Sequence, residues 1–259
     1  MKNFTLSKGT FRHNQVESHY LLANPENIRT DRFGNTPVAI FTHGFTSNKQ
    51  DLLNWMQKFA SNQVPVLIFD LPGHYLGNLT DVESIHEFHQ ATDQFFQQAK
   101  TLLESTVQQS NLFYLVGGHS LGALLSLLVL DNVFPKTEQT LSLIVGLGSP
   151  KENEQHFFDT ELFSETRKFR DQLVSPAINM KDLFAWSHDI KRTIQVKNRK
   201  IHLICGENDV VVGPEGVERL LEHLKSQNEV TLDKPKKLSH HEPQLAHVHL
   251  YSYLKRNYW

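Results

Sequence analysis

Ser120 lies in the stretch GGHSLGA, with Gly118 and Gly122 two residues away on either side. An apolar run, NLFYLV, precedes the stretch and another, LLSLLVL, follows it. The pattern G-x-S-x-G between a strand and a helix is typical of a sharp turn that exposes a serine hydroxyl, and the helix N-terminus supplies N–H groups that stabilise an oxyanion. We interpret Ser120 as a candidate nucleophile. The alternative is a glycine-rich turn that contains a serine by chance.

A serine hydroxyl needs a base to take its proton and a third group to orient that base. Both groups have candidates downstream. Asp209 follows an apolar run in LICGENDVVVG, and His240 and His241 lie in KLSHHEP, before the last predicted helix. Glu207 is a weaker candidate for the acid. These loops are expected at the carboxyl edge of the sheet, where open α/β folds build their sites.

Short apolar runs rich in β-branched residues predict the strands that position these groups. The runs are 37–43, 64–70, 111–117, 141–148, 200–206 and 229–233. Helices are predicted between them at 47–60, 81–109, 121–132, 214–226 and 243–257. Ser47 and Gln50 predict a capping box at the start of the first helix, and Pro214 and Pro243 open the last two. Alternating strands and helices indicate an α/β fold with crossover connections. The stretch FRHNQVESHYLLAN alternates with period two, which predicts antiparallel edge strands.

A long interval separates the fourth run from the fifth, and a connection of that length should carry structure of its own. We therefore assign 1–150 and 200–259 to the core, and 151–199 to a helical cap plus one helix that packs on the sheet. The interval is rich in large apolar side chains, which either face a substrate or pack the insertion onto the core. They are Phe157, Phe158, Phe163, Phe169, Met180, Phe184 and Trp186.

From residue 37 onward the chain resembles the α/β-hydrolase superfamily in strand order, turn motif, cap placement and the order Ser, Asp, His. The resemblance implies an α/β-hydrolase fold: a mostly parallel central sheet flanked by helices, with a helical cap insertion. It also implies Ser120 as nucleophile, Asp209 as acid and a histidine of the SHH loop as base. We favour His240, because Ser239 is a small residue where the family usually has glycine. His241 is the alternative.

Two further stretches resemble family motifs. FTHGFTSN is similar to the H-G-x element, which implies that the backbone N–H groups of Phe45 and Leu121 form an oxyanion hole. His43 in this element is interpreted as structural. FDLPGHYLGN is similar to D-x-x-G-H-G-x-S, but Tyr75 replaces the second glycine and the serine is missing, so we predict a remodelled loop with a structural Asp70.

The composition narrows the possible partners. The chain has 259 residues with 26 basic and 28 acidic side chains, so no charge excess favours nucleic acid or an anionic membrane. Cys205 is the only cysteine, so the chain cannot form an intrachain disulfide. No apolar run reaches the ~20 residues that span a bilayer, and the first residues do not resemble a secretory signal. We expect a cytoplasmic monomer or homodimer that acts on a small molecule.

His247 and His249 are two residues apart on a predicted helix and do not share a face. His86 and His89 do share one but have no acidic or cysteine ligands in an obvious cluster, so we expect neither metal nor cofactor. The expected function is hydrolysis of carboxylic esters of apolar acyl or alkyl groups through an acyl-enzyme, as in a carboxylesterase or small lipase. A thioesterase, an acyltransferase or a carbon–carbon bond hydrolase would use the same three residues. A non-catalytic ligand-binding protein of this fold is the alternative of another class.

Overall fold

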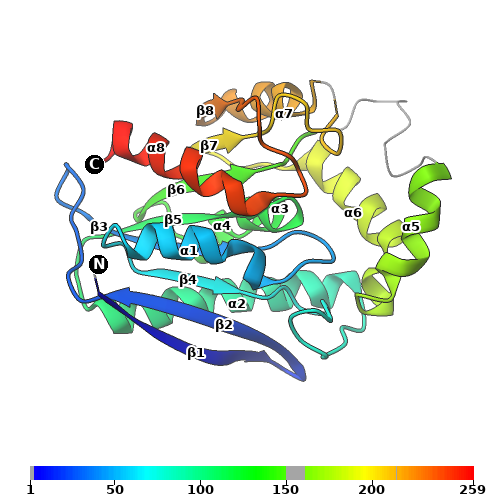
Figure 1. Ribbon diagram of the computed structural model, residues 1–259, viewed down its shortest axis with the longest axis horizontal. Coiled ribbons are helices and arrows are strands. Elements are labelled where there is room, and N and C mark those ends of the chain that lie inside the picture. The colour runs from blue at the N-terminus through cyan, green and yellow to red at the C-terminus, as the bar shows by residue number, and fades with distance from the viewer. Residues whose placement is uncertain (1–2, 150–160, 214) are drawn as a thin grey trace.

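A central eight-stranded sheet organises the computed structural model of the chain (Figure 1). The structure describes residues 3–149, 161–213 and 215–259. The strand order is β1-β2-β4-β3-β5-β6-β7-β8. The strands are β1 (Phe4–His13), β2 (Val16–Pro25), β3 (Thr36–Thr42), β4 (Val66–Phe69), β5 (Leu112–His119), β6 (Gln139–Val145), β7 (Lys200–Ile204) and β8 (Glu229–Asp233).

The first two strands form an antiparallel hairpin, and β2 pairs antiparallel with β4, whereas the pairs among β3 to β8 are all parallel. The period-two alternation before residue 37 thus does correspond to an antiparallel edge. After β3 the chain adds β4 on one side of β3 and β5 on the other. Such a reversal opens a crevice at the carboxyl ends of the two strands that flank it, here β3 and β5.

Helices cover both faces of the sheet (Figure 1). α1 (Leu53–Ala60) and α8 (His247–Asn257) bury Trp55 and Leu254 against one face. α2 (Ile85–Val107), α3 (Leu121–Leu128) and α7 (Gly216–Lys225) bury Phe95 and Leu220 against the other. Burial on both faces explains why the strands read as continuous apolar runs.

Two local predictions are corrected by the structure. The cap of η1 (Lys49–Leu52), the turn that leads into α1, is Asn48, whose side chain accepts a hydrogen bond from the N–H of Gln50. Ser47 instead donates to the carboxylate of Asp51, so the predicted capping box is wrong. The helix predicted at 121–132 is divided into α3 and α4 (Leu130–Val133). The predicted helix start at Pro214 lies outside the described residues.

Between β6 and β7 the described chain forms α5 (Glu161–Asp171), η3 (Pro176–Ile178) and α6 (Met180–Thr193). α5 and α6 lie beyond the carboxyl ends of the strands (Figure 1). α6 connects this region to the core, because Leu183 and Ile190 pack against the cluster that also holds α2. η4 (Pro243–Ala246) precedes α8.

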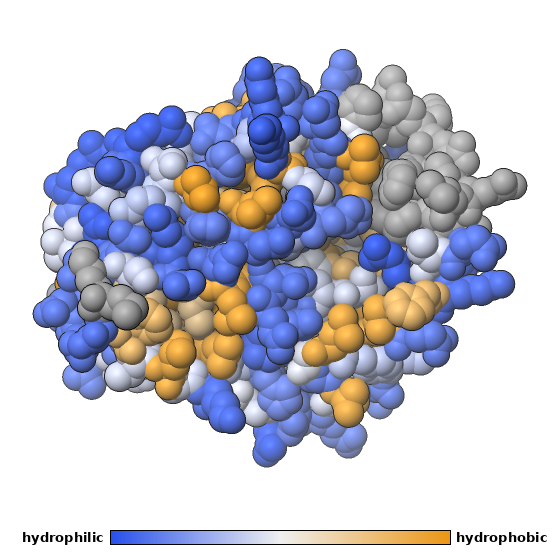
Figure 2. Space-filling view, viewed as in Figure 1, coloured by the Kyte–Doolittle hydropathy of each residue, from blue (hydrophilic) through white to orange (hydrophobic). Residues whose placement is uncertain are grey.

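Most of the face shown in Figure 2 is hydrophilic, and its hydrophobic residues form separate groups. Isolated exposed side chains such as Leu6, Phe33 and Leu79 belong to this ordinary surface pattern. Among the described residues no helix is long and apolar enough to cross a membrane.

Candidate active site

The turn between β5 and α3 holds Ser120 in a left-handed backbone conformation, with φ 52° and ψ −112°. A non-glycine residue reaches this region only where its surroundings enforce it, at a cost of about 1–3 kcal/mol. The flanking glycines allow the neighbouring backbone to approach closely enough to hold this conformation. A β-carbon on Gly118 would lie 2.5 Å from the carbonyl oxygen of Thr42, and one on Gly122 would lie equally close to that oxygen and to the carbonyl oxygen of His43. The motif therefore has the close strand–helix packing that its sequence predicts.

His240 lies between Ser120 and Asp209. Its Nε2 atom is 3.2 Å from Ser120 Oγ, and its Nδ1 atom is 2.8 Å from Asp209 Oδ2. An ionised carboxylate can only accept, so Nδ1 carries the proton and Nε2 of the neutral ring is free to accept from the hydroxyl. Three residues from the loops after β5, β7 and β8 thus meet in hydrogen-bonding geometry.

Asp209 is buried, with 7% of its surface exposed, and every contact keeps it ionised. Its Oδ1 atom accepts hydrogen bonds from the N–H groups of Val211 and Val212, each 3.0 Å long. The thiol of Cys205 donates to Oδ2 over 3.8 Å. Burial by itself would raise the pKa of Asp209, but His240 and the two backbone N–H groups lower it below its ordinary value.

The two alternative candidates point elsewhere. His241 is exposed, and its ring centroid is 5.9 Å from that of His240. Glu207 is exposed as well. Within the described part of the chain, Asp209 is the acid that contacts His240 Nδ1. The structure therefore brings Ser120, Asp209 and His240 together and leaves His241 and Glu207 outside this cluster.

Phe45 and Leu121 flank Ser120 and line the same cavity. Leu121 is the first residue of α3, a position whose N–H has no acceptor within a helix. No hydrogen bond from the N–H of Phe45 or of Leu121 to another described residue is found. Unpaired N–H groups beside a nucleophile have the character expected of an oxyanion hole.

His43 holds the loop that carries Phe45. It is fully buried, its Nδ1 atom donates to the carbonyl oxygen of Gly44 over 2.8 Å, and its Nε2 atom accepts from the N–H of Leu71. Burial lowers the pKa of His43 to about 3, so the ring is neutral. Its 3.7 Å approach to the Asp70 carboxylate is therefore no ion pair. His43 joins the loops after β3 and β4, which agrees with its interpretation as structural.

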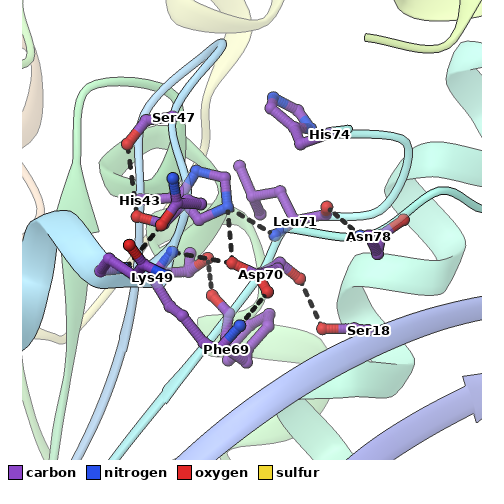
Figure 3. A network of polar contacts seen from close by, with 12 residues as sticks. Ser18, His43, Ser47, Lys49, Phe69, Asp70, Leu71, His74 and Asn78 are labelled. Carbon is purple, nitrogen blue, oxygen red and sulfur yellow. Dashed lines mark hydrogen bonds and ion pairs between the residues drawn. The ribbon is translucent and has the colours of Figure 1, made fainter. Parts of the chain in front are cut away.

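Asp70 connects the same two loops through an ion pair with Lys49 (Figure 3). Its carboxylate accepts from the N–H of Lys49 at 2.7 Å and from the Lys49 ammonium at 2.5 Å, while its carbonyl oxygen accepts from Ser18. Asn78, one place beyond the position where the family usually has serine, donates to the carbonyl oxygen of Leu71 and so holds this loop. This network, which the sequence alone did not reveal, positions the loop of Phe45.

Gly146, at the end of β6, is a second feature missed from the sequence. Its φ is +66°, and an added β-carbon would lie 3.0 Å from His119 Nε2 and 3.2 Å from His240 Nδ1. The rings of His119 and His240 are 4.7 Å apart. Burial and the nearby His240 lower the pKa of His119 far below its usual range, so it adds no competing charge. A glycine that ends an apolar strand run was the available signal.

We expect Gly146→Ala to lower kcat for the ester hydrolysis expected from the sequence about 10- to 100-fold, because the methyl group displaces His240 from Ser120. Gly34→Ala is the matched control: Gly34 also has positive φ, +86°, but nothing lies within 4 Å of its added β-carbon. Both variants should lose stability in thermal melts. Equal kcat values for the two variants would contradict the steric role of Gly146.

The cavity above Ser120 has a volume of about 530 Å³. Its lining includes apolar side chains, among them Leu124, Leu147 and Val212, and the charged side chains of Arg167, Asp189 and Lys191. Of the large apolar residues noted in the sequence, Met180 and Phe184 line it, Trp186 packs on Phe88 and His89, and Phe169 is exposed. Phe157, Phe158 and the side chain of Phe163 lie outside what is described.

Among the residues that the structure describes, no three His, Cys, Asp or Glu side chains lie close enough together to hold a metal ion.

Comparison with known proteins identifies the family of the chain. A model of the α/β hydrolase family matches residues 39–252, most of the chain, so the chain belongs to this family. The family and the fold class that the sequence predicts are therefore confirmed. No curated protein sequence matches at a significant level.

Solved structures resemble the whole chain. One is an epoxide hydrolase from Vigna radiata, with 13% identity, a TM-score of 0.64, and coverage of 97% of this chain and 98% of that one. Another is an esterase from Pyrococcus furiosus, with 17% identity, a TM-score of 0.63, and coverage of 98% and 91%. A third is a cold-adapted esterase from an Arctic intertidal metagenomic library, with 13% identity, a TM-score of 0.58, and coverage of 98% and 94%. At these identities the likeness concerns the fold.

Proposed function

We propose that the chain is a serine hydrolase that cleaves carboxylic esters through an acyl-enzyme. The observation that carries the proposal is the continuous hydrogen-bonded line from Asp209 through His240 to Ser120. A buried, ionised Asp209 fixes the ring so that Nε2 faces the hydroxyl, which is the arrangement that makes a serine nucleophilic. Of the two histidines, we assign the role of base to His240.

In the proposed reaction Ser120 Oγ attacks the ester carbonyl while His240 Nε2 takes its proton. The carbonyl oxygen becomes an oxyanion, which the N–H groups of Phe45 and Leu121 stabilise. The imidazolium then protonates the departing alcohol, and an ester of Ser120 remains. Water, deprotonated by His240, attacks this ester, and Ser120 regains its proton as the acid leaves.

The apolar walls next to Ser120 support an acyl or alkyl group of low polarity, and we propose that α5 and α6 serve as the cap over it. The similar structures include esterases and epoxide hydrolases, and also a thioesterase domain from the curacin biosynthetic pathway. A serine at position 120 disfavours epoxide opening of the kind that uses an aspartate nucleophile. Thioesters would react by the same steps, so they belong in the test.

The proposal is tested by treating the folded protein with a fluorophosphonate and locating the adduct by mass spectrometry. We expect one phosphonylated residue, Ser120, and hydrolysis of chromogenic esters that stops in proportion to labelling. Ser126, six residues along and buried, serves as an internal control and should stay unmodified. Folded protein whose Ser120 stays unlabelled, with no turnover of ester or thioester panels, would instead indicate a binding protein.

A further inference from the structure

Lys191 is a cation in the cavity that the proposed reaction does not use. It lies in the last turn of α6, and Met180, Phe184 and Lys191 all line the cavity. These positions are four and seven residues apart, about one and two turns, so they form one stripe along the helix. Helix C-termini favour cations, which explains a lysine in this turn but not its position on the side that faces the cavity.

The contacts of α6 show where Lys191 lies relative to the candidate catalytic residues. The ring of Phe184 lies 5.6 Å from that of Phe45, beside the proposed oxyanion hole. Seven residues of helix separate Phe184 from Lys191, a rise of about 10 Å. Side chains on a helix lean toward its N-terminus, so the Lys191 ammonium extends back toward the level of Phe184. One cavity therefore contains both the nucleophile and a positive charge, and apolar side chains such as Leu124, Leu147 and Met180 form part of its wall.

Lys191 has no ion pair or hydrogen bond with any other residue that the structure describes. Arg167, which also lines the cavity, has Asp171 as a partner at 3.6 Å. Burial lowers the pKa of Lys191 to about 8, so the ammonium still predominates at neutral pH. A desolvated charge without a partner costs stability, and side chains that carry such a cost are common where a ligand supplies the partner.

We propose that the substrate carries a carboxylate at the end of an apolar arm, and that the Lys191 ammonium binds this carboxylate while the ester carbonyl lies at Ser120. The inference rests on the proposed function and names its substrate class. A single negative charge suits the site, because Asp189 also lines the cavity and would repel a dianion more strongly than a monoanion. The ion pair would fix the depth at which the ester binds.

The test compares substrates that differ only in the terminal group. One series consists of aryl hemiesters of succinate, adipate and suberate, which place the carboxylate on the acyl side. The other consists of butyrate esters of ω-hydroxy acids, which place it on the alcohol side. Each compound is paired with its terminal methyl ester. We expect wild-type protein to prefer the free carboxylate in one series, with an optimum arm length.

In Lys191→Met this preference, measured as the ratio of kcat/KM values, should fall about 10- to 100-fold, the loss expected for one charge-assisted hydrogen bond. Lys191→Arg should retain most of the preference. Arg192→Met removes a charge from the next, exposed residue of the same turn and should leave the ratio unchanged. The melting temperature of Lys191→Met should not fall, because the lost charge has no partner among the described residues. If Lys191→Met does not fold, Lys191→Gln takes its place.

A ratio that stays the same in Lys191→Met and Lys191→Gln would overturn the inference, and so would a wild-type protein that prefers every methyl ester. Both results leave the proposed function intact as long as methyl esters are hydrolysed and Ser120 is labelled. Loss of labelling and of all turnover in folded wild-type protein would instead remove the proposed function, and this inference with it.

Discussion

Replacing His240 with alanine should lower kcat for a chromogenic ester by about a million-fold, the order of loss seen when the base of a serine–histidine pair is removed. The reason is geometric: His240 Nε2, 3.2 Å from Ser120 Oγ, is the acceptor for the hydroxyl proton. Ser120→Ala should lose the same amount. Because the two residues act as one unit, the double variant should be no slower than either single variant.

His241→Ala is the matched control, since it removes an adjacent imidazole that is exposed and outside the cluster. Its kcat should stay within a few-fold of wild type. Stopped assays at high enzyme concentration, with circular dichroism to confirm folding, measure both variants. If His241→Ala proved the inactive variant and His240→Ala the active one, our assignment of the base would be wrong.

Asp209→Asn should lower kcat about 10⁴-fold while substrate binding changes little. Asp209 accepts a hydrogen bond from His240 Nδ1, and in the proposed reaction it stabilises the imidazolium that forms when Ser120 attacks. An asparagine amide that keeps the N–H bonds of Val211 and Val212 on its oxygen turns its NH₂ group toward His240. The ring then moves its proton to Nε2 and no longer accepts from Ser120.

The control for this variant is Glu207→Gln, which neutralises an exposed acid two residues away and should keep full activity. Steady-state kinetics separates the effects, because loss of orientation lowers kcat, whereas loss of binding raises KM. An Asp209→Asn protein with kcat within ten-fold of wild type would show that another group orients His240.

Chain order and local pattern predicted the sheet, and they placed Ser120, Asp209 and the pair of His240 and His241 in loops at its carboxyl edge. Apolar runs marked the buried strands, and the end of each run located Ser120, Asp209 and His240. The choice between His240 and His241 depends on which ring faces the cluster. Adjacent residues in a loop have no periodicity that predicts this. The two histidines are distinguished by the hydrogen bonds of His240 to Ser120 and Asp209 and by the exposure of His241.

Other features depend on contacts between distant segments. Gly146 matters because of the His119 and His240 rings packed against it, and neither lies near it in the sequence. From the sequence, Lys191 is an ordinary lysine near the end of a helix. Only the tertiary structure shows that it lines the cavity. The capping box failed because Asn48 competes with Ser47 for the same helix start, and the geometry of the preceding turn decides which one caps it.

Because the backbone of Ser120 is held at a positive φ of 52°, the residue that supplies the candidate nucleophile also lowers thermal stability. A glycine there would relax the turn at no steric cost, so a laboratory selection that rewards only survival at high temperature should discard the serine early. Directed evolution toward a more durable catalyst therefore needs a screen for turnover in every round.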